Sequence, residues 1–247
     1  EKSFEIQNLE TPEITVPKPP KLLDFAETPK FSWQGSAGAG GYDIERSTSA
    51  NGPWKIIEHN IDDVDTPGFD LYSDESAVVG ETYYYRLRAL NQAGKSSPSN
   101  IVGPIEIEFL TRVDYAKNLM ILEKYKGLEI NTGDCRSFKE AFSRIHGDKK
   151  AEGIYNVPKD FKEIRVFSYE ASKDPNISFY SSENGIDYEA VKFDVSEYKS
   201  REDNYDYLVP RKYVIRENTS SATKKINYIK FISSDEIDLV RMELEYY

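Results

Sequence analysis

Apolar and polar residues alternate along short stretches in the first half of the chain, and turn-forming residues lie between these stretches. Breaks rich in glycine and proline occur at residues 38–41, 51–53 and 67–68. About seven short strands with such breaks are typical of an immunoglobulin-like β-sandwich, which we expect over residues 21–108. The stretches are KLLDF, KFSWQG, GYDIERS, WKIIEHNI, DLYSDES, TYYYRLRALN and SNIVGPIEI.

The same period-two pattern continues over residues 109–247, where the connections are longer. In Ile177–Phe193, alternating residues flank Asn184-Gly185, a pair that adopts positive φ at low cost, so a hairpin with a tight turn is predicted. Roughly eight antiparallel strands with long connections predict a jelly-roll sandwich, so the whole fold is expected to be all-β. The other stretches are AEGIYNVP, EIRVFSYEA, EAVKFDVSEY, KYVIREN, NYIKFISS and LVRMELEYY.

Residues 1–20 are charged and end in Pro17, Pro19 and Pro20. Proline-rich chain is extended and spaces domains apart, so this segment is expected to be a linker. The sequence starts at Glu1 without an initiator methionine or a signal peptide. We therefore expect a fragment of a longer product, with an N-terminal partner domain ahead of the linker.

The charge balance narrows the choice of partners. The net charge is −11 and the pI about 4.9, and such an acidic surface repels phosphate backbones and anionic lipids. We expect neither a nucleic-acid partner nor membrane insertion, whereas a neutral polysaccharide or oligosaccharide is compatible. The 18 Tyr, 12 Phe and 2 Trp suit a half-buried sheet surface, and they also suit stacking on sugar rings.

Catalytic chemistry is poorly represented. The chain has two histidines, His59 and His146, in different predicted domains, and Cys135 is the single cysteine. A disulfide within the chain is excluded, and with one Cys and two His a structural zinc site is not expected. Among 43 Asp and Glu residues, a pair suited to glycoside hydrolysis would arise by chance, so their number carries no weight. We expect no catalysis in this chain.

The strand TYYYRLRALN carries a resemblance to a known family. Tyr83, Tyr85, Leu87, Ala89 and Asn91 alternate and are followed by the residues GKSSPS, and this pattern resembles the last strand pair of a fibronectin type III domain. The run SWQGSAGAGGYDIERS, followed by NGPWKII, is similar to modules placed after the catalytic domain of secreted bacterial glycoside hydrolases of the mannanase and cellulase kind. The resemblance implies that Trp33, in FSW, is a core residue.

The second half resembles the galactose-binding-like, or discoidin-like, module. The resemblance rests on IYNVPKDFKEIRVFSY, ISFYSSENGIDY, NYIKFI and LVRMELEYY, and Ser182, Asn184, Gly185 and Tyr188 match a recurrent hairpin of that family. It implies a jelly roll over residues 109–247 whose ligands bind to loops at one end.

Three stretches in this half combine aromatic and planar polar groups, which stack on sugars and orient their hydroxyls. They are LEINTGDCRSF, SRIHGDKK and EYKSREDNYDYLVPRK, all expected to be loops. The alternative is that these side chains only cap the sandwich or make structural hydrogen bonds. The candidate ligand-binding residues are Tyr198, Asn204, Tyr205, Tyr207, Arg211, Arg144 and His146.

No cofactor is required by the sequence. Jelly-roll sugar-binding modules of the kind resembled hold a structural calcium ion with oxygen ligands, which implies Asp114, Asp134 and Glu243 as candidates here. No EF-hand spacing supports the site.

Together these expectations describe a non-catalytic, extracellular, carbohydrate-binding accessory module of a polysaccharide-degrading enzyme. A tethered binding module raises the effective concentration of its catalytic domain at an insoluble substrate. The alternative is an architectural or protein-interaction module without a sugar site.

Overall fold

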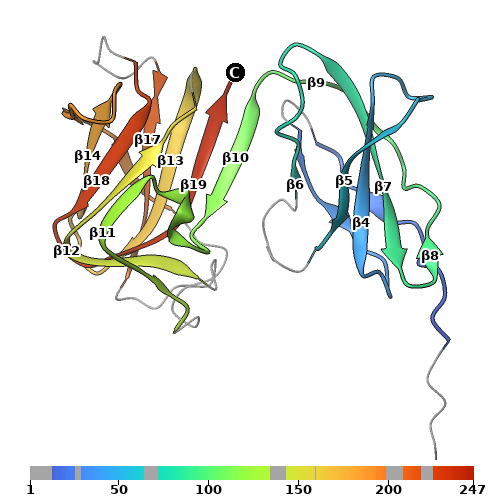
Figure 1. The fold of residues 1–247 in the computed structure, drawn as a ribbon, viewed down its shortest axis with the longest axis horizontal. Coiled ribbons are helices and arrows are strands. Elements are labelled where there is room, and N and C mark those ends of the chain that lie inside the picture. Colours follow the sequence, from blue (N-terminus) through green and yellow to red (C-terminus); the bar gives the residue numbers. More distant parts are fainter. Residues whose placement is uncertain are drawn as a thin grey trace, which may run out of the picture. The chain divides into compact units, whose positions relative to one another are not determined.

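The computed structural model describes residues 13–25, 29–63, 72–133, 143–158, 160–198, 208–217 and 225–247. The chain divides into two compact units, Glu1–Ile107 and Glu108–Tyr247 (Figure 1). Strands account for the regular structure of the described residues, apart from one 3-10 turn, η1 (Leu119–Ile121). The all-β prediction is confirmed. Among the described residues, no helix has the length and apolar character needed to cross a bilayer.

The first unit is a sandwich of short antiparallel strands. β1 pairs with β3 and β2 with β6, while the facing sheet has the order β5-β4-β7-β8, with β9 also on β7. Because β2 and β3 are separated by one residue, they act as a single interrupted strand, and the first layer has three strands. This is the fibronectin type III arrangement, as the sequence predicted. The strands are β1 (Lys21–Leu22), β2 (Lys30–Phe31), β3 (Trp33–Gln34), β4 (Gly41–Ser47), β5 (Lys55–Ile61), β6 (Tyr72–Ser73), β7 (Thr82–Asn91), β8 (Gly94–Lys95) and β9 (Val102–Glu106).

The core of this unit follows the alternation in β7. Tyr83, Tyr85, Leu87 and Ala89 are all buried on one face of that strand. Trp33 is 5% exposed and packs against Tyr42, so its predicted place in the core is confirmed.

The end of the predicted linker lies along the first unit. Residues 13–20 have no regular secondary structure, and Pro17 is buried. The Asn91 side-chain amide donates to the carbonyl of Thr15 (2.7 Å), and the Ser36 hydroxyl donates to the carbonyl of Lys18 (2.6 Å). These two bonds attach this part of the segment to the sandwich.

The second unit has one ten-stranded antiparallel sheet with the order β15-β14-β18-β12-β19-β13-β17-β16, in which β10 also pairs with β19 and β11 with β12. The strands are β10 (Leu110–Tyr115), β11 (Lys124–Asn131), β12 (Arg144–Asn156), β13 (Phe161–Glu170), β14 (Ile177–Ser182), β15 (Glu189–Val191), β16 (Asp194–Glu197), β17 (Val209–Arg216), β18 (Tyr228–Ser233) and β19 (Ile237–Tyr246).

This sheet folds back on itself into two layers. β12 pairs with β19 through residues 145–147 and with β18 through residues 152–156, so it belongs to both layers. Phe179 of β14 and Tyr213 of β17 come from opposite ends of the strand order, yet their ring centroids are 5.2 Å apart. The layers therefore enclose one core, as in the predicted jelly roll.

The predicted hairpin between residues 177 and 193 is present. β14 pairs with β15, with Phe179 opposite Val191. Its turn is not the tight one that was expected, because the connection runs over residues 183–188. Gly185 has φ +72°, and the Asn184 side chain accepts two backbone N–H bonds from the residues after Gly185. Asn-Gly shapes this connection, but the side-chain bonds of Asn184 lengthen it beyond two residues.

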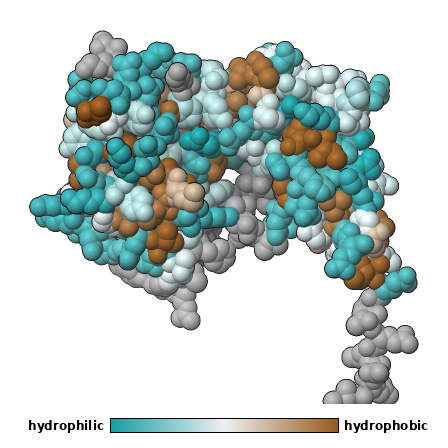
Figure 2. All heavy atoms as spheres, viewed as in Figure 1, coloured by the Kyte–Doolittle hydropathy of each residue, from teal (hydrophilic) through white to brown (hydrophobic). Residues whose placement is uncertain are grey.

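Apolar side chains outside the cores are scattered. On the side seen in Figure 2, hydrophobic residues of each unit form small separate patches among hydrophilic ones. The most exposed large apolar side chains, Met120 (91%) and Ile186 (79%), lie in η1 and in the β14–β15 connection. Isolated exposed residues of this kind are normal on a protein surface and do not mark a site.

Candidate functional site

One layer of the second unit, formed by β10, β19, β13, β17 and β16, has a polar and aromatic face opposite its core face. In β13, Ile164 and Val166 lie in the core. The residues that alternate with them, Arg165 and Phe167, therefore point to the other side of the sheet. We call this side of the layer, together with the N-terminal end of β12 that pairs with β19, the outer face.

Strand register arranges the outer face in four rows. Two rows contain aromatic rings, and the other two are mainly charged. The rows are Glu129–His146–Asp238–Tyr169–Pro210, Tyr115–Arg241–Phe167–Lys212, Val113–Glu243–Arg165–Val214 and Thr111–Glu245–Glu163–Arg216.

The aromatic rows centre on Phe167. Tyr198, the residue that follows β16, packs edge-on against Phe167 at 5.2 Å between ring centroids, and the Arg241 guanidinium lies 3.6 Å from the Phe167 centroid. Phe167 and Tyr169 are buried, whereas Tyr198 is half-buried. The Tyr198 backbone N–H donates to the carbonyl of Pro210 (3.1 Å), which fixes the approach of its ring to the sheet. Of the three rings Phe167, Tyr169 and Tyr198, Tyr198 is therefore the one most accessible from solvent.

The charged rows centre on Arg165. Its guanidinium is hydrogen-bonded to Glu245 (2.5 Å), forms an ion pair with Glu163 and lies 3.5 Å from Glu243. Burial alone would lower the pKa of Arg165, but Glu245, with Glu163 and Glu243, outweighs it and raises the pKa above its ordinary value. The charge of Arg165 is thus fixed, and its side chain remains 26% exposed. This guanidinium and its carboxylates offer planar donors and acceptors side by side.

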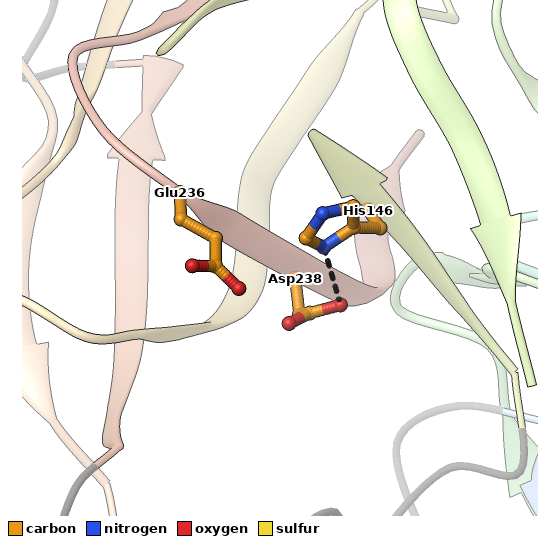
Figure 3. A group of neighbouring side chains, drawn as sticks. All are labelled: His146, Glu236 and Asp238. Atoms are coloured by element: carbon orange, nitrogen blue, oxygen red, sulfur yellow. Dashed lines mark hydrogen bonds and ion pairs between the residues drawn. The ribbon is translucent and has the colours of Figure 1, made fainter. Parts of the chain in front are cut away.

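Arg144 and His146 lie on strand β12, so the prediction that they belong to a loop is wrong. Ile145 between them is fully buried and lies opposite Leu239, and this one apolar residue was too little to reveal the strand. Arg144 is 1% exposed, and its Nε lies 3.3 Å from Asp238 Oδ1. His146 Nδ1 lies at the same distance from that oxygen (Figure 3). His146 lies in the same row as Tyr169, so it borders the aromatic group.

Arg211 also lies on a strand rather than in a loop, and it faces the core side of β17. It is 5% exposed, forms a 3.1 Å ion pair with Glu170 and donates to the carbonyl of Ser172 (3.2 Å). Glu170 also accepts the Tyr213 hydroxyl (2.6 Å), and burial, followed by this bond, raises the pKa of Tyr213. Arg211 therefore belongs to a buried polar cluster and not to the outer face.

Asn204, Tyr205, Tyr207 and Asp134 lie outside the described residues.

For the calcium set, Asp114 is opposite Met242 on the core side of the sheet, whereas Glu243 is on the outer face. Asp114 accepts from Arg112 Nε (3.0 Å), and Glu243 accepts from Arg241 Nε (2.7 Å). A single ion cannot be held by two carboxylates on opposite faces of a sheet. Each of these carboxylates also already forms an ion pair with an arginine side chain.

Sequence reasoning missed Phe167, Arg165 and Arg241. All three lie within stretches that it assigned correctly as strands, where they were read as ordinary alternation. The available signal was the charge pattern of β19, in which Arg241, Glu243 and Glu245 occupy every second position. Charges at that period place a charged row on one face of a strand.

Comparison with known proteins gives likenesses to solved structures alone. No family model and no curated protein matches the chain. An Fn3-like protein from Clostridium thermocellum is 23% identical, with 36% of this chain and 88% of that chain covered and a TM-score of 0.28. A carbohydrate binding module of family 29 is 8% identical over 56% of this chain and 90% of that chain, with a TM-score of 0.33.

A third likeness is to the catalytic unit of a GH87 alpha-1,3-glucanase from Streptomyces thermodiastaticus. It is 10% identical over 55% of this chain and 26% of that chain, with a TM-score of 0.35. At these identities and TM-scores the likenesses assign no ligand and no activity to this chain.

Proposed function

We propose that the second unit is a carbohydrate-binding module and that its ligand, an oligosaccharide or polysaccharide, lies across the outer face. The observation that carries the proposal is that a half-buried tyrosine ring, Tyr198, lies on the same sheet face as a guanidinium–carboxylate group. A pyranose has apolar C–H faces and a rim of hydroxyls, so it needs a flat ring and planar hydrogen-bonding partners together.

In this proposal Tyr198 supplies the ring, and Arg165 with Glu243 orients hydroxyls. Arg165 is 26% and Glu243 17% exposed, so both retain accessible atoms while their positions are held by neighbours. Side chains that are already ordered lose little conformational entropy when a ligand binds. Arg241, stacked on Phe167, supports the floor of the site rather than contacting the sugar.

The wider role follows from the sequence resemblance. The chain is proposed to be a non-catalytic, extracellular part of a polysaccharide-degrading glycoside hydrolase, with the fibronectin type III unit as a spacer. Its mechanism is proximity: weak, reversible binding holds a tethered catalytic domain near insoluble substrate. In that role, binding raises turnover on insoluble substrate and leaves turnover on small soluble substrate unchanged.

Affinity electrophoresis of the chain through gels containing mannan, xylan or galactan, with a pull-down on cellulose, tests the proposal. At least one polysaccharide should retard the chain, and Tyr198→Ala should remove most of the retardation. Tyr125→Ala is the matched control, because Tyr125 is 54% exposed and lies on β11, away from Tyr198. Retardation that is equal in both variants, or absent on every polysaccharide, contradicts the proposal.

The second candidate function is an architectural or protein-interaction module. It is favoured by the pairing of Arg165 and Arg241 with carboxylates of the same face, since such groups are satisfied without a ligand. In that case, the full-length parent protein should lose thermal stability when the second unit is deleted, and no polysaccharide should retard the chain.

A further inference from the structure

Three metal-ligating side chains converge at the junction of β12 and β19. His146, Glu236 and Asp238 each offer one ligand atom, and these atoms lie within 4.8 Å of one another (Figure 3). They come from segments far apart in the sequence, because β12 supplies the histidine while β19 and the residue before it supply the carboxylates. The junction thus contains an imidazole and two carboxylates directed at one space.

The charge that the described residues place around this space is negative. Glu129 of β11 is the cross-strand neighbour of His146 on the side away from Asp238, which adds a third carboxylate. Among the described residues, Arg144 is a cation in contact with the group, and it is directed at Asp238 Oδ1. Within that part of the chain, three carboxylates against this guanidinium leave an excess of negative charge, which a divalent cation would neutralise.

The three side chains differ in burial, so Asp238 is held in place whereas Glu236 is free to adjust its position. Asp238 is 5% exposed and is held by Arg144, which also donates to the carbonyl of Gly133 (2.7 Å). Glu236 is exposed and precedes β19, so its side chain is able to rotate toward the other two. Zinc ligands lie about 2.0–2.2 Å from the ion, so two ligand atoms of one ion are at most about 4.4 Å apart, and Glu236 is the residue able to adjust its position to meet this limit.

We propose that His146, Glu236 and Asp238 bind a divalent first-row transition ion of the zinc class, with Arg144 as a positioning residue for Asp238. Imidazole selects such ions over calcium and magnesium, which prefer all-oxygen ligands. The ion would join β12 to the start of β19, where the two layers of the jelly roll separate. The proposal does not rest on the proposed sugar binding, and its residues differ from the Asp114, Asp134 and Glu243 set.

The test is titration calorimetry of ZnCl2 into the chelator-treated full chain, carried in a Cys135→Ser background so that a thiolate cannot bind zinc. One site per chain is expected, and calcium should bind at least tenfold more weakly. Glu236→Gln and His146→Asn should each weaken zinc binding at least tenfold. Because Glu236 is exposed, its variant should fold even if the His146 variant does not.

The matched control is His59→Asn, which removes the other histidine of the chain. His59 lies in the first unit beside Asp43 and should not affect zinc affinity. A thermal scan gives a second readout, since zinc should raise the unfolding midpoint of the second unit and leave that of the first unchanged. Zinc affinity that survives Glu236→Gln and His146→Asn, or falls equally in His59→Asn, overturns the proposal, as does equal binding of calcium.

Discussion

The two faces of β13 and β19 share one backbone but are built from different chemistry. On the inner face, Ile164 and Leu244 are almost completely buried in the core. On the outer face, Arg165 and Glu243 lie one residue away in the same strands and remain partly exposed. The side chains of both faces are ordered, because both sets make defined contacts. The two faces differ in the kind of interaction that keeps their side chains in place.

Inner residues are held by removal of apolar surface from water, at about 25 cal/mol per Å². Outer residues are held by ion pairs and ring contacts, and a partly exposed ion pair contributes only about 0–1 kcal/mol. A change on the outer face should therefore alter recognition at little cost to folding. A change on the inner face should do the reverse, and the four predictions below follow from this contrast.

The largest effect is expected for Leu244→Ala. Leu244 has 0% exposure, so the substitution leaves a cavity and should lower the free energy of unfolding of the second unit by about 3 kcal/mol. Both tryptophans, Trp33 and Trp54, lie in the first unit, so their fluorescence reports on that unit as an internal control. Circular dichroism during urea unfolding should show the second-unit transition shifted and the fluorescence transition unchanged. A loss below about 1 kcal/mol would contradict a closely packed inner face.

The next effect concerns alkaline pH. Burial, with Glu170, raises the pKa of Tyr213, and burial, with Asp114, raises that of Tyr155. In the unfolded chain tyrosine ionises near pH 10, so above about pH 10 the unfolded state loses protons that the folded state keeps. Stability is complete below that pH and should fall as pH rises, by up to about 1.4 kcal/mol per pH unit for each group.

The measurement is urea unfolding of the second unit at pH 8, 10 and 11, with Tyr213→Phe for comparison. The variant loses its bond to Glu170 at every pH, but its stability should fall less steeply above pH 10. An unchanged slope in the variant would mean that the inner-face hydroxyl does not cause the dependence.

Arg165→Gln is expected to separate recognition from stability. It should weaken the affinity for the retarding polysaccharide about tenfold, or about 1.4 kcal/mol, because a charged donor to hydroxyls is lost. The free energy of unfolding should fall by no more than about 1 kcal/mol, since the side chain is 26% exposed. Gel retardation and urea unfolding of the same sample give both values. A larger loss in folding than in binding would reverse the assigned roles of the two faces.

The smallest effect is expected for Glu243→Gln. The substitution keeps the shape of the side chain but removes its ion pairs with Arg165 and Arg241, and should lower stability by about 0.5 kcal/mol. Unfolding at low salt and at 1 M NaCl checks the cause, because screening should make the variant and the parent chain nearly equal at high salt. A difference that persists at high salt would point to lost packing instead.

Much of the fold was predictable because alternation is a local property. The period-two stretches that became β4, β7, β13, β14 and β19 were recognised, since every second residue faces a core in a strand. The start of β12 was not predicted as a strand, because Ile145 is a single apolar residue and the polar residues on both sides of it resemble a loop. For the same reason Arg211 was placed in a loop, although its stretch continues the alternation of β17.

The candidate site was harder to predict because it depends on register between distant strands. Tyr198 was selected from its aromatic, polar surroundings, yet its partner Phe167 lies on another strand and gave no signal. His146 was selected for sugar binding, but the nearness of Glu236 and Asp238 follows only from the pairing of β12 with β19. A sequence separation of 92 residues between His146 and Asp238 leaves no local pattern to detect.

By itself, therefore, the sequence determined the all-β class, the two sandwiches and the faces of most strands, because hydrophobic period and turn chemistry act over a few residues. Only the tertiary structure decided which outward residues meet. It set Arg165 among its carboxylates and Arg241 over Phe167, and it turned Arg211 toward the core. The physical reason is that strand register, fixed by the packing of the inner face, determines which outer side chains become neighbours.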